Sequence, residues 1–394
     1  MAILHSRKTY LLIAILISSV TQAAPVDAFW ARYAHREIPV DSAKLRWQEQ
    51  EAAKDRKSVR LLYNVDFATY FDNREYHEPY QTPQTIFAFR LSPTIGVGMR
   101  DALGGKHQLV AGLHYTQPMG VNWKEVQVDP TAYYRYQYKG FDLNMGMIPY
   151  VNRYTTLPDW LLYDSIAYRH PNMLGALFSY HDQRGFVEFM CDWRGMPTPE
   201  RREMFRLVVD GQYQYKWFNI GAIGQMNHKA NYADTTIHPY EGVCDDIILD
   251  PYIGFNVSSY TPFDSLSLRA GYIVGFERWR EKNINLTPQG FYVELYANWW
   301  FVGLKNTFYY GGNLLPFYKE FGPDLHQGDP FYQSRIYNRT DIFLYLYRSS
   351  FVNFYFSWNL HYDGQSLAHQ QQLIVRFSLD GLKNEQPLRG LFDK

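Results

Sequence analysis

The sequence predicts an all-β chain that forms a transmembrane antiparallel β-barrel of about sixteen strands. Polar and apolar residues alternate in many segments, aromatic residues are abundant, and short connections alternate with long ones. The alternation is clearest in residues 125–138, where valine and tyrosine side chains share one face and charged or amide side chains lie mostly on the other. A period of two residues is that of a strand. Aromatic residues make up 18% of the chain, and rings with a polar tip suit both membrane interfaces.

The alternating segments, taken in chain order, define the expected strands. Each is bounded by turn residues or by a longer polar connection, as strands of a membrane barrel are. The expected strands are residues 59–71, 86–99, 108–116, 126–138, 141–148, 174–180, 186–193, 205–215, 218–227, 247–257, 266–276, 291–299, 302–310, 336–347, 352–361 and 372–379.

Connection lengths follow strand parity, which supports a barrel with both ends of the chain in the periplasm. Connections after even-numbered strands are tight, and those after odd-numbered strands are longer, the pattern expected when short turns and long loops lie on opposite sides of a membrane. The tight connections are 104–105, 139–140, 182–185, 216–217, 259–264, 300–301 and 348–350. The long ones are 73–84, 151–172, 228–245, 277–290 and 311–335, with 117–124, 194–204 and 362–371 of moderate length.

The N-terminus has the pattern of a secretory signal peptide. Arg7 and Lys8 precede an apolar run at 11–20 and a stretch of small residues, so we expect residues 1–23 to be removed. We assign 24–57 to a periplasmic segment, 58–381 to the barrel and 382–394 to a periplasmic tail. The composition of 41–57 suits a helix outside the barrel, an inserted plug or a solvated leader, and the sequence does not choose among them.

Charge and cysteine content exclude some classes of protein. The 39 basic residues balance the 39 acidic ones, so the chain has no electrostatic footprint for nucleic acid. Cys191 and Cys244 are the only cysteines, which permits one bridge but excludes a disulfide scaffold.

The connection at 151–172 is the main candidate site, because it carries more large apolar residues than an exposed loop requires. We expect it to fold into the lumen and to narrow it; an extracellular lid or a partner-binding loop is the alternative. A lumen enclosed by about sixteen strands is too wide for side chains alone to fill. The constriction candidates are Arg153, Asp159, Asp164 and Arg169, and the pore-wall candidates are Arg90, Arg135, Arg202, Arg206, Arg335 and Arg339. We expect Asp159, Asp164 and Arg169 to face Arg135, Arg202 and Arg206 across a narrow gap.

The signal peptide, the alternating strands, the short turns opposite long loops and the long third loop resemble the general porin family of Gram-negative outer membranes. The resemblance covers about residues 59–379 and is architectural. It implies a channel in the cell outer membrane for passive diffusion of small hydrophilic solutes. It also implies contact with outer-membrane lipid and lipopolysaccharide, and a homotrimer or a complex with other outer-membrane proteins. A gated or plugged transporter and a barrel subunit of an assembly or surface-capture complex remain as alternatives.

Motifs of catalysis are absent from the sequence. No GxSxG elbow, P-loop, HExxH or cysteine-rich metal spacing is present. We therefore expect no enzymatic activity, no cofactor and no metal. One alternative stays open: a barrel lipase that brings a serine and a histidine together from neighbouring strands.

Overall fold

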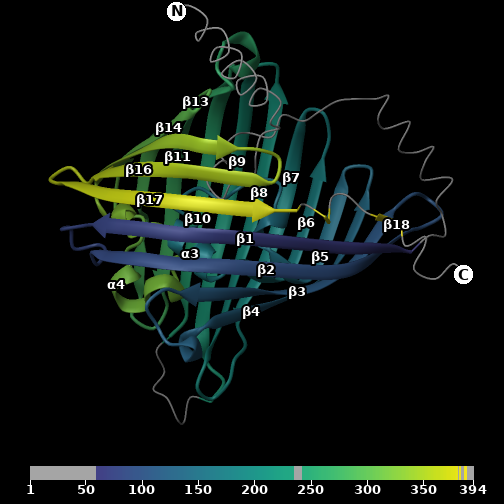
Figure 1. Ribbon diagram of the computed structural model, residues 1–394. Helices are drawn as coiled ribbons and strands as arrows, with labels where there is room; N and C mark the ends of the chain where they lie inside the picture. The colour runs from purple at the N-terminus through teal and green to yellow at the C-terminus, as the bar shows by residue number, and fades with distance from the viewer. Residues whose placement is uncertain (1–58, 235–241, 380, 383–385, 388–394) are drawn as a thin grey trace, which may run out of the picture.

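The chain folds into a closed antiparallel β-barrel of sixteen long strands (Figure 1). The structure, a computed structural model, describes residues 59–234, 242–379, 381–382 and 386–387. β1 (Arg60–Glu75) pairs with β2 (Gln84–Arg100) on one side and with β17 (Leu367–Ser378) on the other, and this last pairing closes the barrel. The predicted signal peptide and the segment 24–57 lie outside the described residues.

All sixteen predicted strands are confirmed. The strands between β2 and β17 are β3 (Lys106–Pro118), β4 (Gln127–Tyr138), β5 (Phe141–Pro149), β6 (Asn172–His181), β7 (Gly185–Gly195), β8 (Arg202–Tyr215), β9 (Phe218–Tyr232), β10 (Cys244–Asn256), β11 (Ser265–Trp279), β13 (Gln289–Trp299), β14 (Val302–Gly311), β15 (Ile336–Arg348) and β16 (Val352–Tyr362). Two short strands were not predicted: β12 (Ile284–Leu286) pairs with β11, and β18 (Gln386–Pro387), within the predicted tail, pairs with β1.

The two faces of the wall have the polarity that the alternation predicts. In β4, Val128 is 52% exposed on the outside, whereas its neighbours Thr131 and Tyr133 are buried on the inside. Outward apolar side chains such as Ile95 and Leu109 are also exposed, as in a wall that faces lipid. Buried charged residues lie on the inner face, where lipid does not meet them.

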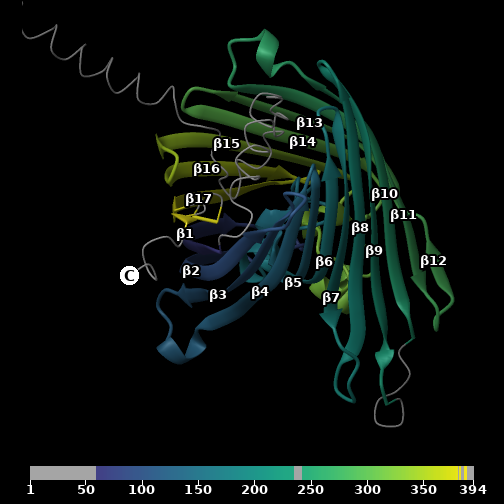
Figure 2. The same cartoon turned by 90° about the vertical axis from the view of Figure 1, so that its right-hand side faces the viewer.

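The connections sort into two ends, which we call the turn end and the loop end. The turn end carries the tight connections, such as Lys139–Gly140, where both residues have positive φ (43° and 86°), as a two-residue hairpin turn of type I′ requires. A Cβ on Gly140 would lie 2.2 Å from the His181 carbonyl oxygen, so a side chain does not fit there. The loop end carries the long connections, and Figure 2 shows β7 to β12 side by side in one wall of the barrel.

Short helices occupy the connections. They are η2 (Trp123–Glu125), η3 (Tyr150–Asn152), α3 (Asp164–Arg169), η4 (Ser258–Tyr260), α4 (Tyr318–Phe321), η5 (Gly322–Asp324) and η6 (Pro330–Gln333). In the described part of the chain, no helix has the length and apolar character needed to cross a membrane. The two cysteines are free: Cys191 lies in β7 and Cys244 in β10, with β8 and β9 between them.

Candidate functional site

Two long connections from the loop end pack against each other inside the barrel (Figure 1). We call residues 150–171, between β5 and β6, the first inner loop, and residues 312–335, between β14 and β15, the second inner loop. The Tyr163 N–H donates to the Gln327 carbonyl (2.7 Å), and the Asp329 N–H donates to the Asp159 carbonyl (2.8 Å). Such pairing satisfies backbone groups that would otherwise be buried without a partner.

Apolar side chains of both inner loops form the core of this packing. Trp160 of the first loop and Phe331 and Tyr332 of the second are buried together with wall residues. The Trp160 ring lies 4.3 Å from that of Tyr292 in β13, and the Phe331 ring stacks on Tyr337 of β15 at 5.3 Å. The large apolar residues of these loops therefore have a place inside the barrel, because they bury area that an exposed loop would leave in water.

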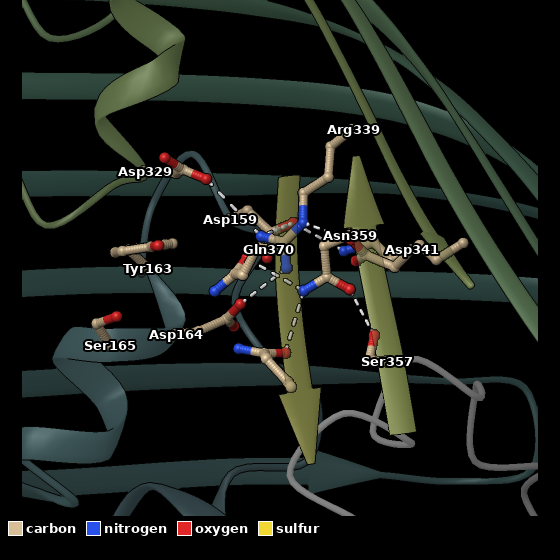
Figure 3. Close-up of polar contacts among 12 residues, drawn as sticks. Asp159, Tyr163, Asp164, Ser165, Asp329, Arg339, Asp341, Ser357, Asn359 and Gln370 are labelled. Carbon is tan, nitrogen blue, oxygen red and sulfur yellow. Dashed lines mark hydrogen bonds and ion pairs between the residues drawn. The ribbon is translucent and has the colours of Figure 1, made fainter. Parts of the chain in front are cut away.

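A buried ionic network joins the inner loops to the wall (Figure 3). Arg339 of β15 contacts Asp341 (2.9 Å), Asp164 (3.0 Å), Asp159 (3.6 Å) and Asp329 (3.7 Å). Lys305 Nζ of β14 donates to Asp159 at 2.9 Å. Because a buried charge without a partner is costly, these contacts set the position of both loops.

Arg153 anchors the start of the first inner loop to a different part of the wall. Its guanidinium contacts Glu188 of β7 at 2.6 Å and Asp210 of β8 at 3.5 Å. The other Glu188 carboxylate oxygen accepts from the Tyr154 N–H at 2.6 Å. Of the four constriction candidates, Arg153, Asp159 and Asp164 are thus buried in ion pairs, whereas Arg169 is exposed.

The expected pairing of the acidic loop residues with wall arginines across a gap is wrong. Asp159 and Asp164 contact Lys305 and Arg339 directly, because the loops fill the lumen at this level and leave no gap there. The other wall candidates have different partners. Arg135 pairs with Asp142, and Arg202 donates to the carbonyls of Ala230 and Gly242. Arg206 donates to Gln327 and Arg90 to the Tyr168 carbonyl, both in the inner loops, whereas Arg335 is exposed.

The rest of the lumen contains a cavity of about 720 Å³. It begins beneath the first inner loop and extends toward the turn end, where it is lined by Lys106, Gln137 and Ser378. Its wall mixes apolar groups with charged ones, among them Asp66 and Arg376, which form an ion pair. A cavity of this size is within the usual range for small-molecule sites, about 300–1,000 Å³.

Ser92, His114 and Asn172 form a hydrogen-bonded chain beside this cavity. Ser92 Oγ lies 2.7 Å from His114 Nδ1, and His114 Nε2 lies 3.1 Å from Asn172 Oδ1. Ser92 and His114 line the cavity, and they come from the neighbouring strands β2 and β3. A hydroxyl, an imidazole and a group that orients the imidazole are the parts of a nucleophilic catalytic site, recognised by geometry and not by sequence order.

The hydrogen bonds of Asn172 fix the tautomer of His114. The Asn172 amide nitrogen donates to the Pro130 carbonyl and to Thr131 Oγ1, both at 2.9 Å, so the amide oxygen faces the imidazole. His114 Nε2 must then carry the proton and donate it to Asn172, which leaves Nδ1 free to accept from Ser92. In this state His114 is poised as a general base.

Arg90 adds a cation to the same face of the cavity. It lies two residues before Ser92 in β2, so the two side chains share the inner face. Its Nη1 donates to the Tyr168 carbonyl at 2.9 Å, and its buried Nε has no hydrogen-bond partner among the residues that the structure describes. Arg90 thus places a positive charge in the wall of the cavity that Ser92 and His114 also line.

Sequence reasoning missed this trio, although two of its three residues could have been found. Leu91 pairs with Tyr115 and Arg100 with Lys106, so the register of the β2–β3 hairpin sets Ser92 opposite His114. Both residues lie on faces that the alternation assigns to the lumen. A search for serine and histidine opposite each other in a predicted hairpin finds the pair; Asn172, from β6, has no such local signal.

The closed barrel and its apolar outer face define an outer-membrane β-barrel of the porin type, which is the predicted location and fold. The chain is similar in fold to OccK5 (OpdH) of Pseudomonas aeruginosa, with a TM-score of 0.51 and 7% identity over 81% of this chain and 98% of that one. It is also similar to OprD of the same organism, with a TM-score of 0.51 and 9% identity over 83% and 97%. No curated protein matches the sequence.

By sequence, the chain belongs to the Lipid A 3'-O-deacylase-type family, whose model matches residues 52–381. This match spans all sixteen long strands of the barrel. The expectation that the chain is not an enzyme is therefore wrong, because the family is an enzyme family. The expectation failed because it depended on contiguous motifs, whereas a barrel assembles its site from separate strands.

Proposed function

We propose that this protein is an outer-membrane deacylase that hydrolyses an ester-linked acyl chain of a lipid, with Ser92 as nucleophile and His114 as general base. The observation that carries the proposal is the 2.7 Å contact between Ser92 Oγ and His114 Nδ1 at the cavity wall. Family membership supports the reaction class and suggests the acyl ester of lipid A as substrate.

The hydrogen-bond directions support one order of proton transfers. The Ser92 hydroxyl proton moves to His114 Nδ1 as Oγ attacks the ester carbonyl carbon, and the tetrahedral intermediate carries the negative charge on the former carbonyl oxygen. His114 then gives that proton to the departing sugar hydroxyl. Water, deprotonated by the same imidazole, attacks the carbonyl carbon of the acyl-serine. The bond from that carbon to Ser92 Oγ then breaks, Oγ takes the proton back from His114 Nδ1, and a free fatty acid leaves. Asn172 holds the imidazole throughout by accepting from Nε2.

Arg90 and the cavity supply the remaining requirements of this reaction. The Arg90 guanidinium lines the same cavity and shares the inner face of β2 with Ser92, so its positive charge is suited to the oxygen that becomes negative in the intermediate. Tyr70, Ile374 and Ala68 give part of the cavity an apolar lining that suits an acyl chain. The cavity thus pairs an apolar compartment with a polar reacting centre.

The test is fatty-acid release from lipid A by the purified protein, measured by mass spectrometry, for wild type, S92A and H114A. General base catalysis contributes about 10²–10⁴-fold, so H114A should lose at least about 100-fold, and S92A at least as much. S179A removes another inward serine with 5% exposure and should keep wild-type activity. Heat-modifiable migration checks that every variant is folded. Wild-type rates in S92A and H114A would refute the assigned site.

A serine-directed fluorophosphonate distinguishes the two roles open to the Ser92–His114 pair. Labelling of wild type and S179A but not of S92A supports a covalent acyl-serine. Activity without any labelling would instead assign the attack to a water molecule that His114 deprotonates, with Ser92 as a hydrogen-bonding group.

A second function, passive diffusion of small hydrophilic solutes, is favoured by the charge-lined cavity that extends to the turn end. In this function the first inner loop is the constriction, and movement of the two inner loops would gate the channel. Purified protein in planar bilayers should then show steady or gated conductance that S92A does not change. Silence in wild type and after replacement of Asp159 and Asp164 by asparagine would exclude the diffusion function.

The proposed topology places the turn end in the periplasm and the loop end at the cell surface, in contact with lipopolysaccharide. Its support is the parity of connection lengths. An epitope inserted after Gly364, in the connection between β16 and β17, should be accessible to antibody on intact cells, and one at Gly140 should not. Cross-linking in membranes tests the predicted homotrimer.

A further inference from the structure

We propose that Asp246, Glu277 and His326 bind a divalent transition-metal ion of the zinc class, and that this ion fixes the second inner loop to the barrel wall. The three side chains come together from β10, β11 and the second inner loop. Each is about 1% exposed. One ligand atom from each lies within 4.8 Å of the others.

The wall supplies two carboxylates side by side. Asp246 and Glu277 are directly paired residues of the antiparallel strands β10 and β11, so their side chains share the inner face. No lysine or arginine forms an ion pair with either carboxylate within the described ranges. Two buried carboxylates next to each other repel unless a cation or a proton lies between them.

The histidine lies over this pair at distances too long for hydrogen bonds. His326 Nδ1 is 3.6 Å from Asp246 Oδ2, and His326 Nε2 is 3.8 Å from Glu277 Oε2. In the described structure, both imidazole nitrogens, both Glu277 oxygens and Asp246 Oδ1 have no hydrogen-bond partner. Buried polar atoms are nearly always satisfied, so three adjacent side chains with unpaired atoms, one ligand atom of each within 4.8 Å of the others, indicate a missing ligand.

The spacing and the types of ligand favour a zinc-class ion. Tetrahedral zinc–ligand bonds of about 2.0–2.2 Å to nitrogen and oxygen separate the ligand atoms by about 3.3–3.6 Å, so the three side chains, now within 4.8 Å of one another, need to move only slightly to bind it. A set of one imidazole and two carboxylates suits zinc and other late first-row transition metals, whereas calcium and magnesium prefer oxygen ligands throughout. Asn227 of β9 donates to Asp246 Oδ2 at 2.7 Å, the kind of outer contact that orients a metal ligand.

The position of His326 gives the ion a structural role. The next residue, Gln327, accepts from the Tyr163 N–H and from Arg206, and Asp329 donates to the Asp159 carbonyl. An ion that holds His326 against β10 and β11 therefore also stabilises the contact between the two inner loops. The ion site lies on β10 and β11, whereas Ser92 lies on β2. The ion therefore takes no part in the proposed hydrolysis.

The test is metal content of the untagged full chain, extracted in detergent, saturated with Zn²⁺ and freed of excess by dialysis. Elemental analysis should find about one zinc per chain in wild type and much less in E277Q and H326N. E320Q and H77N alter exposed residues of the same types and should bind as wild type does. A wild-type chain without stoichiometric zinc, or E277Q and H326N with unchanged zinc, would overturn the proposal.

Hydrogen exchange of residues 312–335 gives a readout that does not depend on variants folding. Zinc should slow exchange of this loop in wild type relative to protein treated with a chelator, because a bound ligand stabilises the state that it binds. The same comparison in E277Q should show no difference. Equal exchange of wild type with zinc and with chelator would show that no ion fixes the loop.

Discussion

The two parts of the lumen use charge in opposite ways. At the loop end, Arg339 and Lys305 each contact carboxylates from the inner loops or the wall, and both side chains are almost fully buried. Toward the turn end, Arg135 and Arg376 line the cavity. Each forms an ion pair with an aspartate of the wall, and both side chains remain partly exposed. The same wall thus carries a packed region and a hollow one.

The difference teaches where function can reside in such a barrel. Charges in the packed region are engaged by the loops and hold them in place, so they are unavailable to a substrate. At the boundary of the hollow region, Ser92, His114 and Arg90 line the cavity. Polar groups that line a cavity indicate a site, whereas charges held in ion pairs between loop and wall indicate structure.

Removing Arg339 should have the largest effect on the packed region. R339M leaves four nearby carboxylates without their shared guanidinium, and breaking a buried pair costs about 3–5 kcal/mol. The backbone amides of both inner loops should therefore exchange faster with solvent, by a factor that corresponds to this loss of free energy. R169M removes an exposed arginine of the first inner loop and should change protection little. Unchanged exchange in R339M would mean that apolar packing alone holds the loops.

Replacing Asn172 should affect the hollow region in a different way, by lowering catalysis without loosening the loops. N172A removes the acceptor that orients His114, so kcat should fall about 100-fold with KM nearly unchanged. N172D keeps an acceptor and should retain more activity than N172A. Steady-state kinetics of lipid deacylation would measure both. A rise in KM alone would assign Asn172 to substrate binding.

Adding one methyl group at Gly328 should loosen the packed region by a smaller amount. A Cβ there would lie 2.2 Å from the Trp160 carbonyl oxygen, where the two inner loops meet. Overpacking of this kind costs about 1–3 kcal/mol, so G328A should raise protease sensitivity of the loops. G224A, where a Cβ meets nothing within 4 Å, is the matched control. Equal sensitivity of the two variants would argue that the loops adjust freely.

Replacing Arg135 should have the smallest effect. Its side chain is 23% exposed, and its partner Asp142 also accepts from Gln137 and Asn144, so the carboxylate keeps two donors when the arginine is replaced. R135Q should therefore change the free energy of unfolding by less than about 1 kcal/mol, measured by urea titration in detergent or lipid. A loss as large as that of R339M would remove the distinction between the two parts of the lumen.

The sequence predicted the barrel better than it predicted the site, for a physical reason. Alternation in segments such as 125–138 is local, because inner and outer faces of one strand meet different solvents, and it located every long strand. Partners of Asp159 and Asp164 were mispredicted, because Lys305 and Arg339 come from strands whose position relative to the first inner loop depends on the whole fold. Asn172 was missed for the same reason.

The contact between the inner loops also sets an order of assembly. Asp159 meets Asp329, and Asp164 meets Arg339, across long stretches of chain that include many of the strands. Contacts between such distant segments form late, since the entropy of closing the intervening chain opposes them. We therefore expect the hairpins of neighbouring strands to form before the two inner loops meet. The His326 cluster, which joins β10 and β11 to the second inner loop, belongs to these long-range contacts.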